Sequence, residues 1–135
     1  MSRVNSIRKG KHGERLAAKY LRSLGFEDCI RGQQHAGGPE SPDVDGIPGV
    51  HLEVKFGVGG MDLGTQLHGD AISQSMREAG DGEAWCVLWK RPRSRQWLLT
   101  VGLEGFKTTT VATLGTDEDI RRWLESRMAG VHEPQ

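Results

Sequence analysis

Two apolar segments joined by a short basic turn constrain the fold of this chain most strongly. Residues 84–91 (Ala-Trp-Cys-Val-Leu-Trp-Lys-Arg) and residues 96–101 (Gln-Trp-Leu-Leu-Thr-Val) are rich in aromatic and branched side chains. Segments of this composition form strands, and a connection this short joins strands that run antiparallel. We therefore predict a β-hairpin in the second half of the chain.

Apolar spacing and helix-end signals predict three helices. The first covers residues 5–24 and is followed by Gly25, a residue that often ends a helix. The second covers residues 65–79. The third covers residues 117–128, with acids in its first turn and Arg127 near its end, as the helix dipole favours.

Three further strands are expected before the hairpin, over residues 27–31, 43–45 and 50–56, with a polar, glycine-rich loop over 33–42. No internal repeat and no linker divides the chain. The order of elements predicts an α/β or α+β fold, a sheet flanked by helices, in a single domain that covers residues 1–135.

The composition predicts a soluble globular protein, with 36% apolar and 27% charged residues among 135. No apolar run approaches the roughly 20 residues of a membrane span, and no apolar stretch follows the charged N-terminus as in a secretory signal. Cys29 and Cys86 stand alone, which favours buried thiols over a disulfide or a zinc site. We expect a cytoplasmic protein with no membrane partner and no organic cofactor.

The charge is zero overall but unevenly distributed. Residues 1–34 carry eight lysines and arginines against three acids, whereas residues 36–89 carry nine acids against Lys55 and Arg77. Basic segments around an acidic middle suit a nuclease that uses a metal, because cations hold phosphates and carboxylates hold the metal. The alternative is ordinary variation of charge on a solvated surface.

The first helix places a carboxylate on its apolar face. At 100° per residue, Glu14 shares a face with Ala17 and Leu21. A buried carboxylate costs several kcal/mol unless a cation compensates it, so Glu14 indicates either a salt bridge or a metal nearby. A separate arc of basic residues lies on another face of this helix. It either follows the phosphate backbone of a nucleic acid or is an ordinary solvated surface. These residues are Arg8, Lys11, Arg15, Lys19 and Arg22.

The segment around residues 50–56 carries the sharpest chemical signal. Strand residues two apart point the same way, so Glu53 and Lys55 share one face while Leu52 and Val54 face the core. A neighbouring strand or turn would bring Asp43 alongside. Two carboxylates can hold Mg²⁺, which polarises a phosphate and activates water, and a lysine nearby can orient that water or stabilise charge.

These residues resemble a known signature. Pro42-Asp43, nine intervening residues and then Glu53-Val54-Lys55 is similar to the motif of PD-(D/E)xK nucleases, as is a glutamate in the preceding helix (Gly13-Glu14-Arg15). The resemblance implies a restriction-endonuclease-like core of four mixed strands flanked by helices, and phosphodiester hydrolysis with Mg²⁺, which Mn²⁺ can replace. It covers about residues 8–101, and the chain beyond adds no information.

Small size and the sequence Gly-x-x-Gly-Glu-Arg are most similar to Holliday junction resolvases of archaeal and phage type. That implies a homodimer that makes paired nicks across a four-way DNA junction, in the host cytoplasm if a phage encodes it. The alternatives are another structure-specific or nicking nuclease of the same superfamily, and a non-catalytic DNA-binding protein on this fold.

The resemblance assigns metal binding to Glu14, Asp43 and Glu53, and a catalytic role to this set together with Lys55 and Gln74. Asp45 is an alternative to Asp43, but Asp45-Gly46 is typical of a turn, so we favour Asp43. For Gln74, a capping or surface role is the alternative.

A second phosphate-binding patch is expected on the hairpin turn, from Lys90, Arg91 and Arg93 with Arg95 nearby. Two loop residues that precede Asp43, His35 and Ser41, are candidates for contact with the substrate. Arg77 could reach a phosphate, although a surface role is favoured. The tryptophans are expected in the core or a dimer interface rather than stacked on bases. These are Trp85, Trp89, Trp97 and Trp123.

Overall fold

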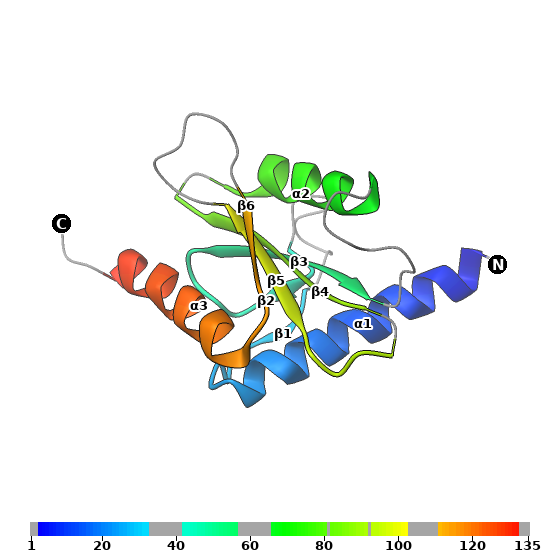
Figure 1. Cartoon of the computed structure of the whole chain (residues 1–135), viewed down its shortest axis with the longest axis horizontal. Helices are drawn as coiled ribbons and strands as arrows, with labels where there is room; N and C mark the ends of the chain where they lie inside the picture. The colour runs from blue at the N-terminus through cyan, green and yellow to red at the C-terminus, as the bar shows by residue number, and fades with distance from the viewer. Residues whose placement is uncertain are drawn as a thin grey trace.

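The computed structural model describes residues 3–32, 42–56, 66–80, 82–91, 93–102 and 111–132. Over these residues the chain forms a six-stranded mixed sheet with helices on both faces (Figure 1). The elements in chain order are α1 (Arg3–Ser23), β1 (Ile30–Arg31), β2 (Val44–Asp45), β3 (Val50–Phe56), α2 (Gln66–Glu78), β4 (Ala84–Lys90), β5 (Leu98–Gly102), β6 (Val111–Leu114) and α3 (Asp117–His132).

The strands lie side by side in sequence order, from β1 to β6. β3 and β4 are parallel, and every other neighbouring pair is antiparallel. A parallel pair needs a crossover connection, and α2 belongs to it. The hairpin expected from the sequence is confirmed, because β4 and β5 pair antiparallel with Leu88 opposite Leu99. The expected α/β arrangement of a mixed sheet flanked by helices is therefore present.

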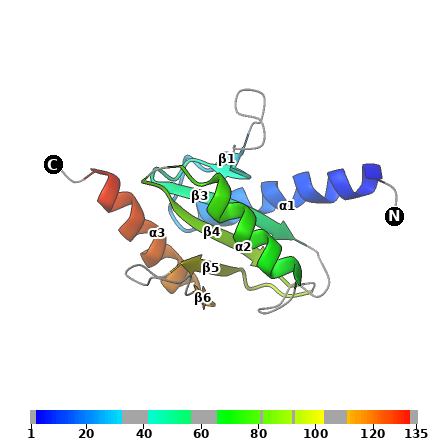
Figure 2. The same cartoon turned by 90° about the horizontal axis from the view of Figure 1, so that it is seen from above.

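The two faces of the sheet are covered by different helices (Figure 2). α1 and α3 contribute Leu21 and Leu124 to the main core, where they pack with Leu52 and other strand residues of that face. α2 covers the opposite face, where Ile72 packs against the small cluster of Val87 and Trp89. A side chain of β3 therefore points toward α1 and α3 or toward α2, according to its parity.

Gly25 ends the first helix, as predicted. Its φ of +108° is a conformation that favours glycine, and its amide donates to the carbonyl of Arg22 at 3.0 Å. The amide of Phe26 donates to the carbonyl of Leu21 at 3.1 Å, which completes the usual pair of C-terminal hydrogen bonds. The chain then turns back toward the sheet at β1.

β6 (Val111–Leu114) lies in a part of the chain for which the sequence predicted no strand. It pairs antiparallel with β5, with Leu99 opposite Leu114. Its four residues are too few to show an alternating pattern, so pairing with a neighbour makes this segment a strand. The described sheet thus has six strands, where the resemblance implied a core of four.

Other predictions about the chain can be compared directly. Cys29 and Cys86 are buried free thiols, as expected. Trp89 and Trp97 are buried in the core, and Trp85 and Trp123 pack partly buried against it. No helix within the described ranges is long and apolar enough to cross a membrane. The glycine-rich loop over 33–42, with His35 and Ser41, lies outside the described residues except for Pro42.

Candidate metal centre

β3 carries the side chains at the centre of the candidate site. Leu52 and Val54 are buried in the main core on the side of α1 and α3, and Glu53 and Lys55 point to the opposite side, as strand parity predicted. β3 is an interior strand, with β2 on one side and β4 on the other. Glu53 is only 2% exposed, so its carboxyl group is removed from bulk water.

Asp43 is held against β3 by the backbone of that strand. Its amide donates to the carbonyl of Leu52 at 3.0 Å, and its Oδ2 accepts a hydrogen bond from the amide of Val54 at 2.8 Å. These two bonds hold the Asp43 side chain beside Glu53, and its carboxyl group raises the pKa of Glu53. The structure therefore brings together the aspartate and the glutamate that carry the resemblance.

Asp45 has a local role in the turn instead. It is exposed, and its Oδ1 accepts a hydrogen bond from the amide of Gly46 at 2.8 Å. Gly46 has a φ of +117°, and a Cβ atom there would lie 2.4 Å from the carbonyl oxygen of Asp28. The Asp45-Gly46 pair is thus part of a tight connection between β2 and β3, as its composition indicated.

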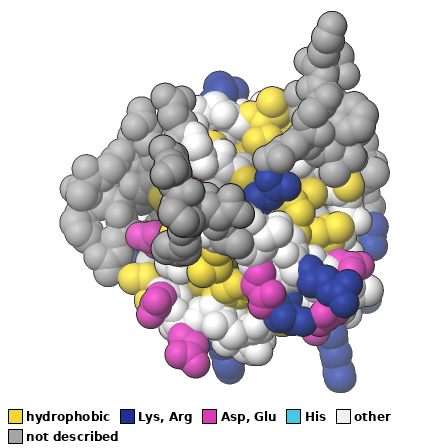
Figure 3. All heavy atoms as spheres, turned by 90° about the vertical axis from the view of Figure 1, so that its left-hand side faces the viewer, with side chains coloured by type: hydrophobic (Ala, Val, Ile, Leu, Met, Phe, Trp, Pro, Cys, Tyr) yellow, Lys and Arg dark blue, Asp and Glu magenta, His cyan; other side chains and the backbone are white. Residues whose placement is uncertain are grey.

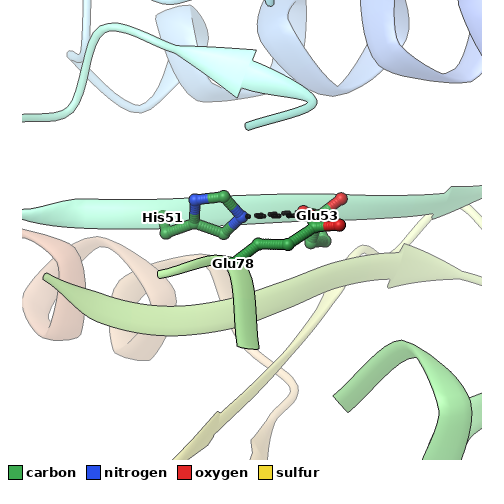
Figure 4. Close-up of side chains that lie close together, drawn as sticks. All are labelled: His51, Glu53 and Glu78. Atoms are coloured by element: carbon green, nitrogen blue, oxygen red, sulfur yellow. Dashed lines mark hydrogen bonds and ion pairs between the residues drawn. The ribbon is translucent and has the colours of Figure 1, made fainter. Parts of the chain in front are cut away.

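Two residues that were not assigned from the sequence complete the cluster. His51 lies two residues before Glu53 on the same face of β3, and its Nε2 is 2.7 Å from Oε1 of Glu53 (Figure 4). Glu78, the last residue of α2, places Oε2 3.8 Å from the same nitrogen. The parity that paired Glu53 with Lys55 also predicts His51 on this face, but nothing in the sequence indicated Glu78.

Gln74 lies at the border of this cluster, one helical turn before Glu78. Its Nε2 donates to Oε1 of Glu78 at 3.3 Å, so it contacts the cluster through that residue. The helix is fixed on the sheet by Ser75, whose buried hydroxyl donates to the carbonyl of Cys86 at 3.2 Å. Gln74 is therefore placed to orient Glu78.

Glu14 reaches the same region from α1. Its side chain is 19% exposed and lies 3.6 Å from a guanidinium nitrogen of Arg31 on β1, so the salt bridge weighed for this residue is present. Burial raises the pKa of Glu14, and the nearby charge of Asp43 raises it further, while Arg31 and Lys11 oppose the shift. Glu14 thus lies beside Asp43 and is incompletely compensated by Arg31.

The electrostatics of Glu53 are the most unusual feature of the cluster. Burial raises the pKa of Glu53 far above its ordinary value, and hydrogen bonds and repulsion from Asp43 and Glu78 raise it further. Among the described residues, no lysine or arginine forms an ion pair with Glu53. The partner of Glu53 is the imidazole of His51, 2.7 Å away, and the pocket favours a bound proton or cation.

Lys55 stands on the same face of β3 as Glu53 and nearer to the strand's end. It is half-buried, and it lies opposite Trp89 of β4 in the parallel register. Lys55 follows Glu53 by two residues and points to the same face of the strand. Because Lys55 is partly exposed, its ammonium group can contact a molecule that approaches from solvent.

The basic residues expected to contact DNA belong to two elements. Lys11, Arg15 and Lys19 are exposed on α1. Arg22 is also exposed, but its guanidinium donates to the carbonyl of Cys29 at 2.7 Å, which ties the end of α1 to the segment before β1. The side chain of Arg8 lies outside the described residues. Within the described residues, the basic side chains expected on this helix are therefore exposed, and Arg22 also makes a structural bond.

On the β4–β5 hairpin, Lys90 and Arg91 lie over aromatic rings. The ammonium of Lys90 is 5.6 Å from the ring centroid of Trp97, and the guanidinium of Arg91 is 5.4 Å from that of Trp89. Arg93 has a φ of +66° and is exposed in the turn. Figures 1 and 2 agree that this turn, the C-terminal end of β3 and the N-terminal half of α1 lie at the same end of the molecule.

The opposite end of the molecule has a different surface. Acidic and basic side chains are intermixed there (Figure 3). On α3, Arg121 pairs with Glu118 and Glu125, and Arg122 pairs with Glu118. Arg77 of α2 is exposed, in agreement with the surface role favoured for it.

Comparisons with models of known families, with curated proteins and with solved structures found no match.

Proposed function

We propose that this protein is a metal-dependent DNA endonuclease whose active site is formed by Asp43, Glu53 and Lys55, with Glu14 at its margin. One observation carries the proposal. Glu53 is 2% exposed, and the carboxyl groups of Asp43 and Glu78 lie near enough to raise its pKa further. Repulsion among them makes the pocket unfavourable without a proton or a cation, and such arrangements are typical of functional sites.

The donors suit a divalent ion. Mg²⁺ and Mn²⁺ prefer carboxylate oxygens, and Asp43 and Glu53 offer two such groups side by side. Glu14 would add a third carboxylate from α1, directly or through water. A bound ion would polarise a phosphate oxygen and lower the pKa of a coordinated water.

The residues of the chain have separate parts in such a reaction. The amide of Val54 holds Oδ2 of Asp43, so the carboxylate is oriented before any ligand arrives. Lys55 presents an ammonium group on the same face as Glu53, where it would stabilise the charge that develops on the phosphate. Because Glu53 is buried, its interactions with charge are weakly screened by solvent.

Exposed cations on α1 and the hairpin support DNA as the substrate. Lys11, Arg15 and Lys19 would contact phosphates along one strand, and Arg91 and Arg93 of the hairpin would add further contacts. A mixed sheet with an acidic pair and a lysine on an interior strand is compatible with a restriction-endonuclease-like core.

The specific form that we propose is a resolvase of four-way DNA junctions. Two symmetric nicks require two active sites, and one chain contributes a single cluster of this kind within its described part. A two-fold homodimer would supply both sites and would recognise the shape of the junction rather than its sequence.

The test is cleavage of a labelled four-way junction, a flap and a plain duplex side by side, with Mg²⁺ and with EDTA. We expect paired nicks in the junction that depend on Mg²⁺. Equal cleavage of all three substrates would favour a less selective nuclease. Tight binding in EDTA without cleavage in Mg²⁺ would favour a DNA-binding protein.

Two variants test the site itself. Glu53→Gln and Lys55→Ala should each lower the cleavage rate by more than about 100-fold, the upper range for removal of a residue that only supports a metal ligand. Junction affinity should stay within a few-fold, because neither residue belongs to the exposed basic surface. Cleavage at the wild-type rate in either variant would show that the active site lies elsewhere.

A further inference from the structure

A histidine and two glutamates converge beside Asp43. Nε2 of His51, a carboxylate oxygen of Glu53 and one of Glu78 all lie within 4.8 Å of one another (Figure 4). The three side chains come from β3 and from the last residue of α2, so residues distant in the sequence meet at one point. His51 and Glu53 are almost fully buried, with side chains 1% and 3% exposed, and Glu78 is 17% exposed.

The spacing of these atoms is close to that of a cation site. Ligand atoms bound to one ion at about 2.1 Å lie roughly 3–4 Å from each other. Nε2 of His51 lies 2.7 Å from Oε1 of Glu53 and 3.8 Å from Oε2 of Glu78. The first distance is shorter than this range and the second lies within it, so an ion would contact all three residues once Nε2 of His51 and Oε1 of Glu53 moved apart.

The donor set differs in kind from the pair formed by Asp43 and Glu53. Imidazole nitrogen favours borderline transition ions such as Zn²⁺ and Co²⁺, whereas Mg²⁺ favours oxygen ligands and retains its waters. The amide of Gln74 donates to Oε1 of Glu78, which orients that carboxylate as an outer partner orients a metal ligand. The cluster thus has one nitrogen ligand, two oxygen ligands and support for one of them.

We propose that His51, Glu53 and Glu78 form a second cation site, selective for a divalent transition ion, that shares Glu53 with the magnesium site. The inference rests on the proposed function in one respect, since Glu53 is a ligand in both. The second site gives His51 and Glu78 a metal-binding role. Neither residue has that role in the nuclease signature that supports the first proposal.

The simplest rival explanation is that His51 only positions Glu53 through a hydrogen bond. His51→Gln separates the two explanations, because a glutamine amide can still donate to Glu53 but is a poor ligand for Co²⁺ or Zn²⁺. Glu78→Gln changes a second ligand of the site at a less buried position. This variant still tests the proposal if His51→Gln does not fold. Thermal unfolding followed by circular dichroism shows which variants are folded.

The measurement is titration of metal-free protein with Co²⁺, followed by its visible absorption, with Zn²⁺ as competitor, and a separate calorimetric titration with Mg²⁺. We expect His51→Gln and Glu78→Gln to lower the affinity for Co²⁺ by at least about tenfold and to change the affinity for Mg²⁺ by less than about threefold. Glu53→Gln should lower both affinities. The matched controls His12→Gln and Glu83→Gln change exposed residues outside the cluster and should alter neither.

Each result has a distinct meaning. Wild-type affinity for Co²⁺ in the folded His51→Gln and Glu78→Gln variants would overturn the second site and leave the endonuclease proposal intact. Equal weakening of Co²⁺ and Mg²⁺ binding in His51→Gln would also overturn it, because His51 would then only hold Glu53 in place. Selective weakening of Co²⁺ binding together with no DNA cleavage would support the second site and count against the proposed function. A wild-type protein that binds neither ion would contradict both.

Discussion

The two faces of β3 carry side chains of opposite character. Leu52 and Val54 enter an apolar core closed by α1 and α3. On the opposite face, His51 and Glu53 are equally buried but meet carboxyl groups from two other segments. The first face contributes stability through burial, whereas the second concentrates charge that burial disfavours. Residue parity therefore separates the apolar face of this strand from its charged face.

The apolar face should give the larger change in stability when it is broken. Leu52 is 1% exposed, and its replacement by alanine leaves a cavity in the main core. We expect Leu52→Ala to lower the free energy of unfolding by about 2–5 kcal/mol, measured by urea denaturation.

Ile30→Ala on β1 is the matched control for this change, because Ile30 is 51% exposed. It should alter the free energy of unfolding by about 0.5 kcal/mol or less. A comparable decrease in both variants would show that the apolar face of β3 is not specially important.

The polar face should instead give a stability that depends on pH. The pKa of Glu53 is raised in the folded protein, so the native state binds an extra proton at pH values above the ordinary value of 4.5. The stability due to this group is full below that value and is lost as the pH rises toward the folded pKa. Relative to Glu53→Gln, the metal-free wild type should therefore lose about 1.4 kcal/mol per pH unit in this window.

Urea denaturation of both proteins in EDTA, at several pH values between about 5 and about 8, measures this difference. Mg²⁺ should reduce it, because an ion that binds the native state replaces the proton. Parallel pH profiles of wild type and Glu53→Gln would show that Glu53 is not protonated in the fold.

The smallest effect is expected at the surface. Replacing Arg15 and Lys19 by glutamine should reduce the slope of log affinity for junction DNA against log salt by about one for each phosphate that the protein no longer binds. The matched control is the replacement of Arg121 and Arg122 on α3, which pair with Glu118. An equal change of slope in the control would place the DNA surface elsewhere.

Much of the fold is predictable from the sequence because its signals are local. The limits of β3 match residues 50–56, and α1 ends at Ser23, directly before the turn that contains Gly25. β6 is not predictable in this way, because four residues of mixed character become a strand only through pairing with β5.

The candidate site is predictable where it depends on one strand. Parity places Glu53 and Lys55 together, and the same rule includes His51. Turn chemistry favours Asp43 over Asp45, and the structure puts Asp43 beside Glu53 while Asp45 bonds within its turn. Helical spacing groups Arg22 with the DNA contacts, yet its bond to the carbonyl of Cys29 depends on how the chain folds back after α1.

The sequence by itself determined the alternation of β3, the end of α1 and the kinds of side chain available for binding a metal, because each depends on neighbours in the chain. Tertiary structure alone decided which carboxylates meet. Glu78 joins His51 and Glu53 because α2 packs on the sheet and ends there, and the charge of Asp43 acts on Glu14 because α1 packs beside β1 and β3. Burial, which raises the pKa of Glu53, likewise exists only after these elements have packed together.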